Sequence, residues 1–178
     1  VVIDPAENDK RILKILEKDR FRLKYIINTH GHADHIGGNA FLKEHTNARL
    51  LIHTNDKDML GDSKRNLSFY MNFAIQSPPA DDFLVENKKI NIGNLDIAIV
   101  HTPGHSPGSV CLIIQDIVFT GDTLFAQGIG RTDLPGGSFA EIQKAIKEKL
   151  MVLERGKRIL PGHGPGSTLE EEIKCNLI

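Results

Sequence analysis

A short segment near the N-terminus places four side chains that can bind metal ions within six residues. They are His30, His32, Asp34 and His35, in the run THGHADH that directly follows the apolar run YIIN at residues 25–28. Two imidazoles at positions i and i+2 can converge on one cation, while the carboxylate and the next imidazole can face a second. The segment therefore predicts a metal-binding loop at the end of a strand. The competing interpretation is a solvated polar loop that contains histidine by chance.

Three further segments carry a histidine or an aspartate in the same setting. His105 lies in the run VHTPGHS, Asp122 in FTGDT and His163 in LPGHG. Each follows a short apolar run and lies among Gly, Pro, Ser or Thr, which predicts a tight turn at the end of a strand. Glycines at such turns let the backbone approach a crowded centre closely. These segments weaken the interpretation of residues 29–35 as an ordinary polar loop.

Taken together, the runs THGHADH, HTPGHSPGS, GDTLF and PGHGP resemble the metallo-β-lactamase superfamily, and within it the small glyoxalase II-like (hydroxyacylglutathione hydrolase-like) hydrolases. The resemblance extends from Val1 to about Asn176. It implies an α/β fold, the four-layer αββα metallo-β-lactamase sandwich, in which both sheets are buried by helices. Hydrophobic periodicity alone does not distinguish this architecture from other α/β folds.

The resemblance also implies a ligand set for two divalent metal ions, with zinc expected first and iron or manganese as alternatives. The residues that it assigns to the first metal are His30, His32 and His105. Those that it assigns to the second metal are Asp34, His35 and His163, with Asp122 as the bridge. Carboxylates in such a set partly neutralise two adjacent dications.

For this ligand set the resemblance implies hydrolysis of a glutathione thioester such as S-lactoylglutathione. The attacking group would be a metal-bridging hydroxide, since a bound metal lowers the pKa of water from about 15.7 to about 7. One metal would stabilise the oxyanion, and Asp34 would orient the hydroxide as well as bind metal.

Three alternatives from other classes stay open. An iron-dependent persulfide dioxygenase of the same superfamily would use a subset of the histidines with Asp122 as a mononuclear centre. A dinuclear phosphodiesterase or nuclease would use both metals, but the balanced charge predicts no basic groove. A metal-stabilised binding module is disfavoured because the proposed ligands leave coordination positions open, and β-lactam hydrolysis is a weaker variant of the enzyme hypothesis.

Arg131 is the candidate for binding a carboxylate of the substrate, because its planar donors suit bidentate pairing. The equally weighted alternative is an ion pair with Asp133 within the same loop. Asp133 stands where the larger glyoxalase II enzymes commonly place a tyrosine. Those enzymes also have a C-terminal helical domain with glutathione contacts, which this sequence does not contain, so we expect weak saturation by substrate.

Four other residues receive supporting or structural roles. The family places an acid at the position of Asp4, and we assign it to orienting a histidine or the loop backbone, with a simple turn before Pro5 as the alternative. His45 is expected to meet carbonyl groups at a helix C-terminus. His53 and His101 end apolar runs and are expected to be structural or, for His101, to support a ligand.

Composition agrees with one soluble enzyme domain over residues 1–178. With 22 Lys and Arg against 23 Asp and Glu, no nucleic-acid or membrane partner is predicted, and a small-molecule acyl thioester is the expected partner. No signal peptide or membrane span is apparent, so we expect a cytoplasmic protein. The sequence leaves the oligomeric state open.

The two cysteines do not form a secreted disulfide framework. Cys111 lies in an apolar run and is expected to be a buried core thiol rather than a metal ligand, and Cys175 lies in the terminal helix. The upstream β-hairpin that is usual in the family does not occur before the strand expected at residues 1–3. We expect the numbering to start inside a longer gene product, because losing edge strands would expose unpaired backbone.

Periodicity and turn residues predict the remaining elements. Helices are expected at 8–18, 36–44, 139–150 and 169–175, and strands at 1–3, 25–28, 50–53, 95–101, 109–115 and 117–120. Ser167 and Glu170 match a capping box before the last helix. The segment 61–86 is polar and predicts no clear element.

Overall fold

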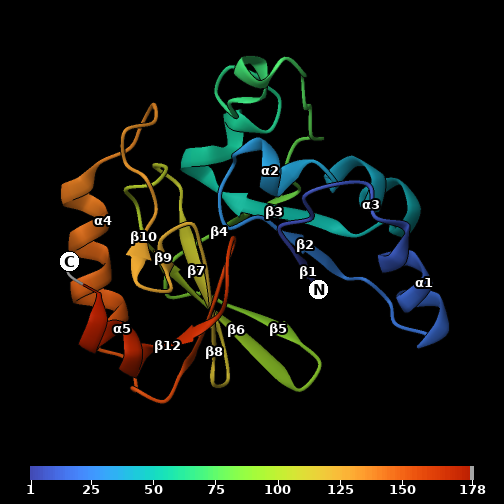
Figure 1. The fold of residues 1–178 in the computed structure, drawn as a ribbon. Coiled ribbons are helices and arrows are strands. Elements are labelled where there is room, and N and C mark those ends of the chain that lie inside the picture. The colour runs from blue at the N-terminus through green and yellow to red at the C-terminus, as the bar shows by residue number, and fades with distance from the viewer. Residues whose placement is uncertain (177–178) are drawn as a thin grey trace. The chain divides into compact units, whose positions relative to one another are not determined.

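The computed structural model describes residues 1–176, which form two compact units. The first unit is Val1–Phe83 and the second begins at Leu84. Each unit has strands and helices of its own, which Figure 1 shows with their labels. The single domain expected over residues 1–178 stays a prediction.

The first sheet has the strand order β1-β2-β3-β4. Its strands are β1 (Val2–Ile3), β2 (Tyr25–Ile27), β3 (Arg49–His53) and β4 (Asp82–Leu84). β2 pairs in parallel with both β1 and β3, so that Ile26 lies opposite Val2 on one side and Leu50 on the other. Parallel strands end at the same edge of a sheet, and this edge is where the histidine-rich segment begins. The predicted strands of this unit are confirmed to within a residue or two.

The helices of the first unit are α1 (Lys10–Lys18), α2 (Ala33–Ile36) and α3 (Asn39–Thr46), with the 3-10 helices η1 (Thr54–Met59) and η2 (Ser68–Met71). α1 begins at Lys10 because the carboxylate of Asp9 accepts a hydrogen bond from the backbone N–H of Arg11 at 2.8 Å. α3 packs against β2 and β3 (Figure 1).

The prediction of one helix over 36–44 is wrong at its start, because two glycines separate α2 from α3. A Cβ atom on Gly37 would lie 2.1 Å from the carbonyl oxygen of Ala6, and one on Gly38 would lie 2.4 Å from that of Glu7. The N–H of Gly38 also donates to the carbonyl oxygen of Pro5 at 2.7 Å. The chain after β1 therefore passes against the glycine pair, and this close approach interrupts the helix.

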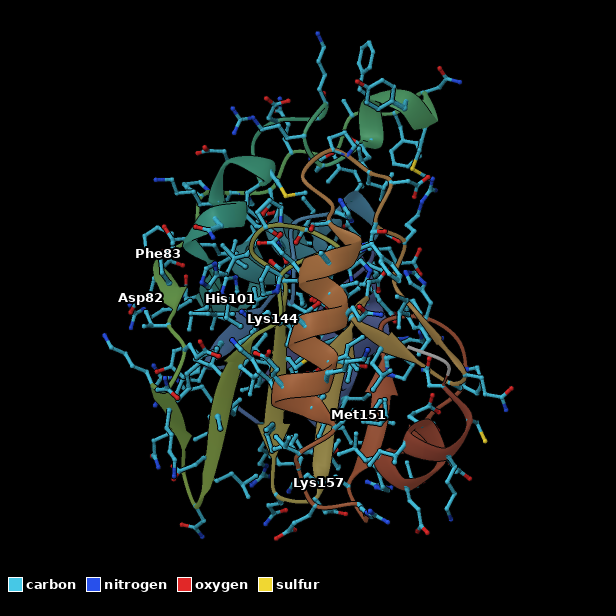
Figure 2. All side chains as sticks on the ribbon, turned by 90° about the vertical axis from the view of Figure 1, so that its left-hand side faces the viewer. Asp82, Phe83, His101, Lys144, Met151 and Lys157 are labelled. Atoms are coloured by element: carbon cyan, nitrogen blue, oxygen red, sulfur yellow. The ribbon has the colours of Figure 1, made fainter. Side chains whose placement is uncertain are left out.

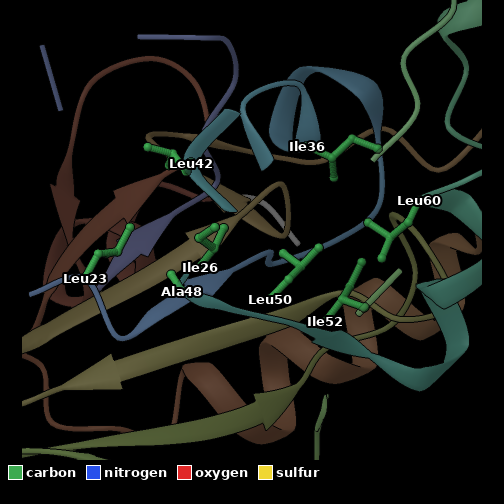
Figure 3. Packing of buried hydrophobic residues seen from close by; sticks show 8 residues of the cluster. All are labelled: Leu23, Ile26, Ile36, Leu42, Ala48, Leu50, Ile52 and Leu60. Carbon is green, nitrogen blue, oxygen red and sulfur yellow. The ribbon is translucent and has the colours of Figure 1, made fainter. Parts of the chain in front are cut away.

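The core of the first unit lies where the helices cover the sheet. Figure 3 shows the cluster, in which Ile26, Leu42 and Leu50 are fully buried. Ile36 and Ile52 are buried against the same group. Because β2 and β3 are apolar at nearly every position, they match strands that are covered on both faces.

The second unit contains a six-stranded sheet in the order β12-β11-β8-β7-β6-β5 and a two-stranded ribbon of β9 and β10. The strands of the sheet are β5 (Lys89–Ile92), β6 (Leu95–His101), β7 (Val110–Ile114), β8 (Ile117–Gly121), β11 (Arg158–Pro161) and β12 (Ser167–Thr168), and those of the ribbon are β9 (Leu124–Phe125) and β10 (Gly128–Ile129). All neighbours in the sheet are antiparallel except β8 and β11, which are parallel. The three strands predicted between residues 95 and 120 are confirmed.

Helix α4 (Phe139–Ala145) continues into a π-helical turn, η3 (Ile146–Leu150), and α5 (Leu169–Cys175) ends the described chain. Figure 2 shows α4 lying across the strands of the second sheet, with Lys144 on the helix and Met151 beyond its end. Ile142 and Ile146 pack there against Val118 and Ile159 of the sheet. The helix predicted over 139–150 is thus confirmed, with its last turn widened.

The capping box of α5 is formed by Thr168 and Glu171, so the prediction of Ser167 and Glu170 is wrong by one residue. Ser167 belongs to β12 and pairs with Ile159 of β11, which keeps its backbone in the strand. Thr168 is the last extended residue, and its hydroxyl accepts from the N–H of Glu171. Both pairs match the S/T-x-x-E pattern, and the strand pairing selects between them.

The segment 61–86, which shows no clear pattern in the sequence, contains η2 and β4, and polar side chains hold the loops beside η2. The side-chain amide of Asn66 donates to the carbonyl oxygens of Met59 and Ile75, both at 3.0 Å. This anchor presents an exposed apolar group at the loop tip, consisting of Phe69, Tyr70, Met71 and Phe73. No helix within residues 1–176 is long and apolar enough to cross a membrane.

The glycine pair leads to a test of the fold. We expect Gly37→Ala to lower the free energy of unfolding by about 1–3 kcal/mol, because the added methyl group overlaps the backbone of Ala6. Gly61→Ala is the matched control, since its Cβ atom would meet nothing within 4 Å. Urea unfolding followed by circular dichroism measures both. Equal stability of the two variants would contradict the close approach at Gly37.

Candidate metal centre

The histidine loop, residues 29–35, joins the end of β2 to helix α2 and gathers three imidazoles in the first unit. The ring centroid of His30 lies 4.7 Å from that of His32 and 4.0 Å from that of His35. All three side chains are buried, whereas the side chain of Asp34 is 52% exposed. Burying three imidazoles together costs desolvation free energy unless each is hydrogen-bonded or binds an ion.

Asp4 holds both ends of this loop. Its Oδ1 atom accepts from the backbone N–H of Thr29 at 2.7 Å, and its Oδ2 atom accepts from the Thr29 hydroxyl at 2.6 Å and from Nδ1 of His35 at 3.0 Å. In a neutral imidazole that donates from Nδ1, the lone pair is on Nε2. Asp4 therefore makes the contacts expected of a residue that orients a metal ligand.

The same reasoning applies to His30. The Thr29 hydroxyl gives its proton to Asp4, so it accepts from Nδ1 of His30, which lies 3.2 Å away. The lone pair of His30 is then also on Nε2. The neighbouring carboxylate of Asp34 is half exposed and adds an oxygen donor beside these imidazoles. Imidazole and carboxylate donors of this kind suit zinc or iron, so the residues present fit a transition metal.

In the second unit Asp122 lies between two histidines. Its Oδ2 atom is 3.6 Å from Nε2 of His105 and 3.6 Å from Nε2 of His163. Asp122 follows β8 and His163 follows β11, and the parallel pairing of these strands, with Gly121 opposite Pro161, brings both residues to one sheet edge. The bridging role assigned to Asp122 stays a prediction.

His105 is oriented by the backbone of the loop after β10. Its Nδ1 atom donates to the carbonyl oxygen of Arg131 at 2.9 Å, which leaves the lone pair on Nε2, the atom that faces Asp122. Gly130 makes this approach possible, because a Cβ atom there would lie 1.7 Å from the carbonyl oxygen of Asp122 and 3.2 Å from Nδ1 of His105. The imidazole tautomer is therefore set by the backbone.

The structure also identifies one acidic residue to which the sequence analysis assigned no role. Asp56 in η1 is fully buried, and its Oδ2 atom accepts from the backbone N–H of Gly31 at 3.0 Å. Nothing in the sequence distinguishes Asp56 from the neighbouring Asp58, which is exposed and pairs with Arg65. Only tertiary packing reveals the difference.

The histidines expected to be structural make ordinary polar contacts. Nδ1 of His45 donates to the carbonyl oxygen of Phe41 at 2.8 Å, near the C-terminus of α3. His53 caps η1 by accepting from the N–H of Asn55, and Nε2 of His101 donates to the carbonyl oxygen of Pro107 at 3.0 Å. These contacts agree with the roles expected from the sequence.

Arg131 forms the ion pair that was the alternative to substrate binding. Its Nε and Nη2 atoms donate to the two carboxylate oxygens of Asp133, both at 2.8 Å. These hydrogen bonds lower the pKa of Asp133 to about 2. Both side chains are exposed, so the pair can open at small cost. Binding of a substrate carboxylate by Arg131 stays a prediction.

Cys111 is a core thiol, as expected. Its side chain is fully buried, its Sγ atom lies 3.4 Å from the hydroxyl oxygen of Thr102, and burial raises the pKa of the thiol to about 11. The thiolate that binds metals is therefore strongly disfavoured at neutral pH. Cys175 is exposed on α5.

Comparison with known proteins identifies relatives of this chain. The family model of the Metallo-beta-lactamase superfamily matches residues 1–163. The probable metallo-hydrolase YqgX of Bacillus subtilis is 35% identical over 179 residues, which covers 99% of this chain and 85% of the relative. The hydroxyacylglutathione hydrolase GloC of Haemophilus influenzae is 33% identical over 184 residues, which covers 98% of this chain and 84% of the relative.

Two solved structures resemble the chain closely. The BLEG-1 B3 metallo-beta-lactamase has a TM-score of 0.92 at 33% identity and matches 98% of this chain and 86% of its own. TTHA1623 in a di-iron-bound form has a TM-score of 0.84 at 32% identity and matches 98% of this chain and 87% of its own. These matches confirm the fold class expected from the sequence, an α/β fold with two sheets flanked by helices.

The two cysteines should differ sharply in reactivity. We expect one thiol per chain to react quickly with Ellman's reagent at pH 8, because Cys175 is exposed while Cys111 is buried with a raised pKa. In Cys175→Ser the fast reaction should disappear, and Cys111 should react only after unfolding in guanidinium. Rapid reaction of the folded Cys175→Ser variant would contradict the burial of Cys111.

Proposed function

This chain belongs to the metallo-beta-lactamase superfamily, and from that premise we propose that it is a metal-dependent hydrolase that cleaves acyl thioesters. The observation that carries the proposal is the position of Asp122, whose carboxylate is equidistant from Nε2 of His105 and of His163. A carboxylate so placed can bridge two cations. The buried imidazoles of the histidine loop, oriented by Asp4, are of the donor type that this chemistry uses.

We assign the metal ligands as the family resemblance implies. His30, His32 and His105 would hold one ion, Asp34, His35 and His163 the other, and Asp122 would bridge them. Zinc is the ion we propose, and the di-iron form of TTHA1623 makes iron the first alternative. When bound, such a metal pair lowers the pKa of a water molecule so that hydroxide is available at neutral pH.

The residues of the chain have two tasks in the proposed reaction. The half-exposed carboxylate of Asp34 would accept a hydrogen bond from the attacking water and so direct its lone pair. Asp4 and the carbonyl oxygen of Arg131 keep His35 and His105 in the tautomer that presents Nε2. The water oxygen bonds to the thioester carbonyl carbon, the carbon–sulfur bond breaks, and the products are a carboxylic acid and a thiol.

A glutathione thioester such as S-lactoylglutathione is the substrate we propose. The support is the relative from Haemophilus influenzae, whose name is hydroxyacylglutathione hydrolase, and the motifs described above. Arg131 would leave Asp133 to bind a carboxylate of the glutathione moiety. A small-molecule substrate and a cytoplasmic location remain part of this proposal.

The reaction and the metal content can be tested together. We expect about two transition-metal ions per chain after metal saturation and turnover of S-lactoylglutathione in preference to a phosphodiester or a β-lactam. Elemental analysis and a substrate panel measure this. A single iron with oxygen consumption on a glutathione persulfide would overturn the proposal in favour of a dioxygenase, and phosphodiester turnover would favour a phosphodiesterase.

Substitutions can distinguish the proposed bridging residue, Asp122, from histidines that are not assigned as metal ligands. Asp122→Ala should lower turnover by more than about 100-fold, since loss of even an indirect metal partner costs about 10- to 100-fold. His45→Ala and His53→Ala are the controls and should keep most activity, with circular dichroism as the check on folding. Loss of activity in a folded control would show that the ligand list is incomplete.

Substrate binding can be assigned by steady-state kinetics. We expect Arg131→Ala to raise KM for S-lactoylglutathione with little change in kcat, the pattern for loss of uniform binding. A short acyl thioester without glutathione carboxylates should show no such effect. Tyr70→Ser tests the exposed loop tip as the alternative binding surface. An increase in KM with Tyr70→Ser but not with Arg131→Ala would reject the role of Arg131.

A further inference from the structure

The backbone of the histidine loop is held at alternate residues by three separate segments of the first unit. The N–H of Thr29 donates to the Asp4 carboxylate at 2.7 Å, and the N–H of Gly31 donates to the Asp56 carboxylate at 3.0 Å. The N–H of Ala33 donates to the carbonyl oxygen of Asn66 at 3.0 Å. The acceptors come from the end of β1, from η1 and from the loop 61–86.

The residues between these three anchors carry the first two imidazoles. His30 lies between the anchored N–H groups of Thr29 and Gly31, and His32 lies between those of Gly31 and Ala33. The middle anchor, at Gly31, is therefore the only one of the three that adjoins both histidines. A fixed N–H group at Gly31 restricts the backbone torsions on both sides of this residue. It therefore also restricts the distance between the imidazole rings of His30 and His32.

Asp56 supplies this middle anchor from a rigid and buried position. Its side chain is fully buried, and it belongs to the 3-10 helix η1. η1 also packs tightly against the loop, because a Cβ atom on Gly31 would lie 2.6 Å from Cβ of Met59 and 3.2 Å from the carbonyl oxygen of Asp56.

We propose that Asp56 is a positioning residue for the metal centre, which acts through the Gly31 N–H to hold His30 and His32 at the separation that one metal ion needs. This inference rests on the proposed function for the identity of the two ligands. It assigns to Asp56 no contact with metal or substrate. The hydrogen bond, rather than the charge of the carboxylate, carries the effect.

Metal affinity without any substrate tests this role. The metal-free protein is titrated with Zn²⁺ in competition with a chromophoric chelator. Asp56→Ala should bind the first Zn²⁺ about 10- to 100-fold more weakly than the wild type, the usual cost of losing a partner that orients a ligand. Asp56→Asn keeps an acceptor oxygen without the charge and should restore nearly the wild-type affinity.

Asp58→Ala is the matched control, because Asp58 lies on the same 3-10 helix but is exposed and pairs with Arg65. Its affinity for Zn²⁺ should equal that of the wild type. Wild-type affinity of Asp56→Ala, or an equally large loss in Asp56→Asn, would overturn the proposal. A chain that shows the expected affinities but cleaves no thioester would reject the proposed function and leave this inference standing.

A second measurement keeps the proposal testable if Asp56→Ala does not fold. In the metal-free wild type, the Gly31 amide should exchange its hydrogen slowly, because the N–H is bonded to a buried carboxylate. Asp56→Asn should keep this protection. Fast exchange of the Gly31 amide in the folded wild type would show that the anchor is absent and would overturn the proposal.

Discussion

The hydrogen bonds of the Asp4 carboxylate are the interaction on which the histidine loop depends. One side chain at the end of β1 accepts from the backbone and the hydroxyl of Thr29 and from the ring of His35. These bonds tie the first strand to both ends of a loop that lies about 25–31 positions later in the chain. They also set the tautomers of His30 and His35, so that backbone position and ligand chemistry are decided together.

In the first unit Asp4 positions the histidine side chains. In the second unit strand pairing positions them instead. β8 and β11 are the parallel pair of the second sheet, and their common direction puts Asp122 and His163 at one edge. His105 joins them through a turn in which Gly104 adopts a φ of 131° and packs against Ile142 of α4. Polar groups at the ends of strands can thus meet while the strands themselves stay apolar and buried.

Buried asparagine side chains near the histidine loop form hydrogen bonds with one another and with the backbone. Asn28 and Asn39 bond to each other and to neighbouring groups beneath α2, and Asn66 closes the loop after η1. Such networks keep a unique arrangement when every member is satisfied. Hydrogen bonds therefore hold the histidine loop and its surroundings at several points, which would lower the cost of ordering the rings when an ion binds.

The amino-acid sequence by itself determined where the side chains that can bind metal occur, because these donor residues are recognised by local spacing and by glycine-rich turns that follow apolar runs. It also predicted six of the twelve strands in the described residues and three of the helices, since hydrophobic period is a local property. Only the tertiary structure decided that Asp56 rather than Asp58 is buried, that Gly37 interrupts a helix, and that Thr168 caps α5. Each of these depends on a segment distant in sequence that packs against the residue, and local patterns contain no information about that contact.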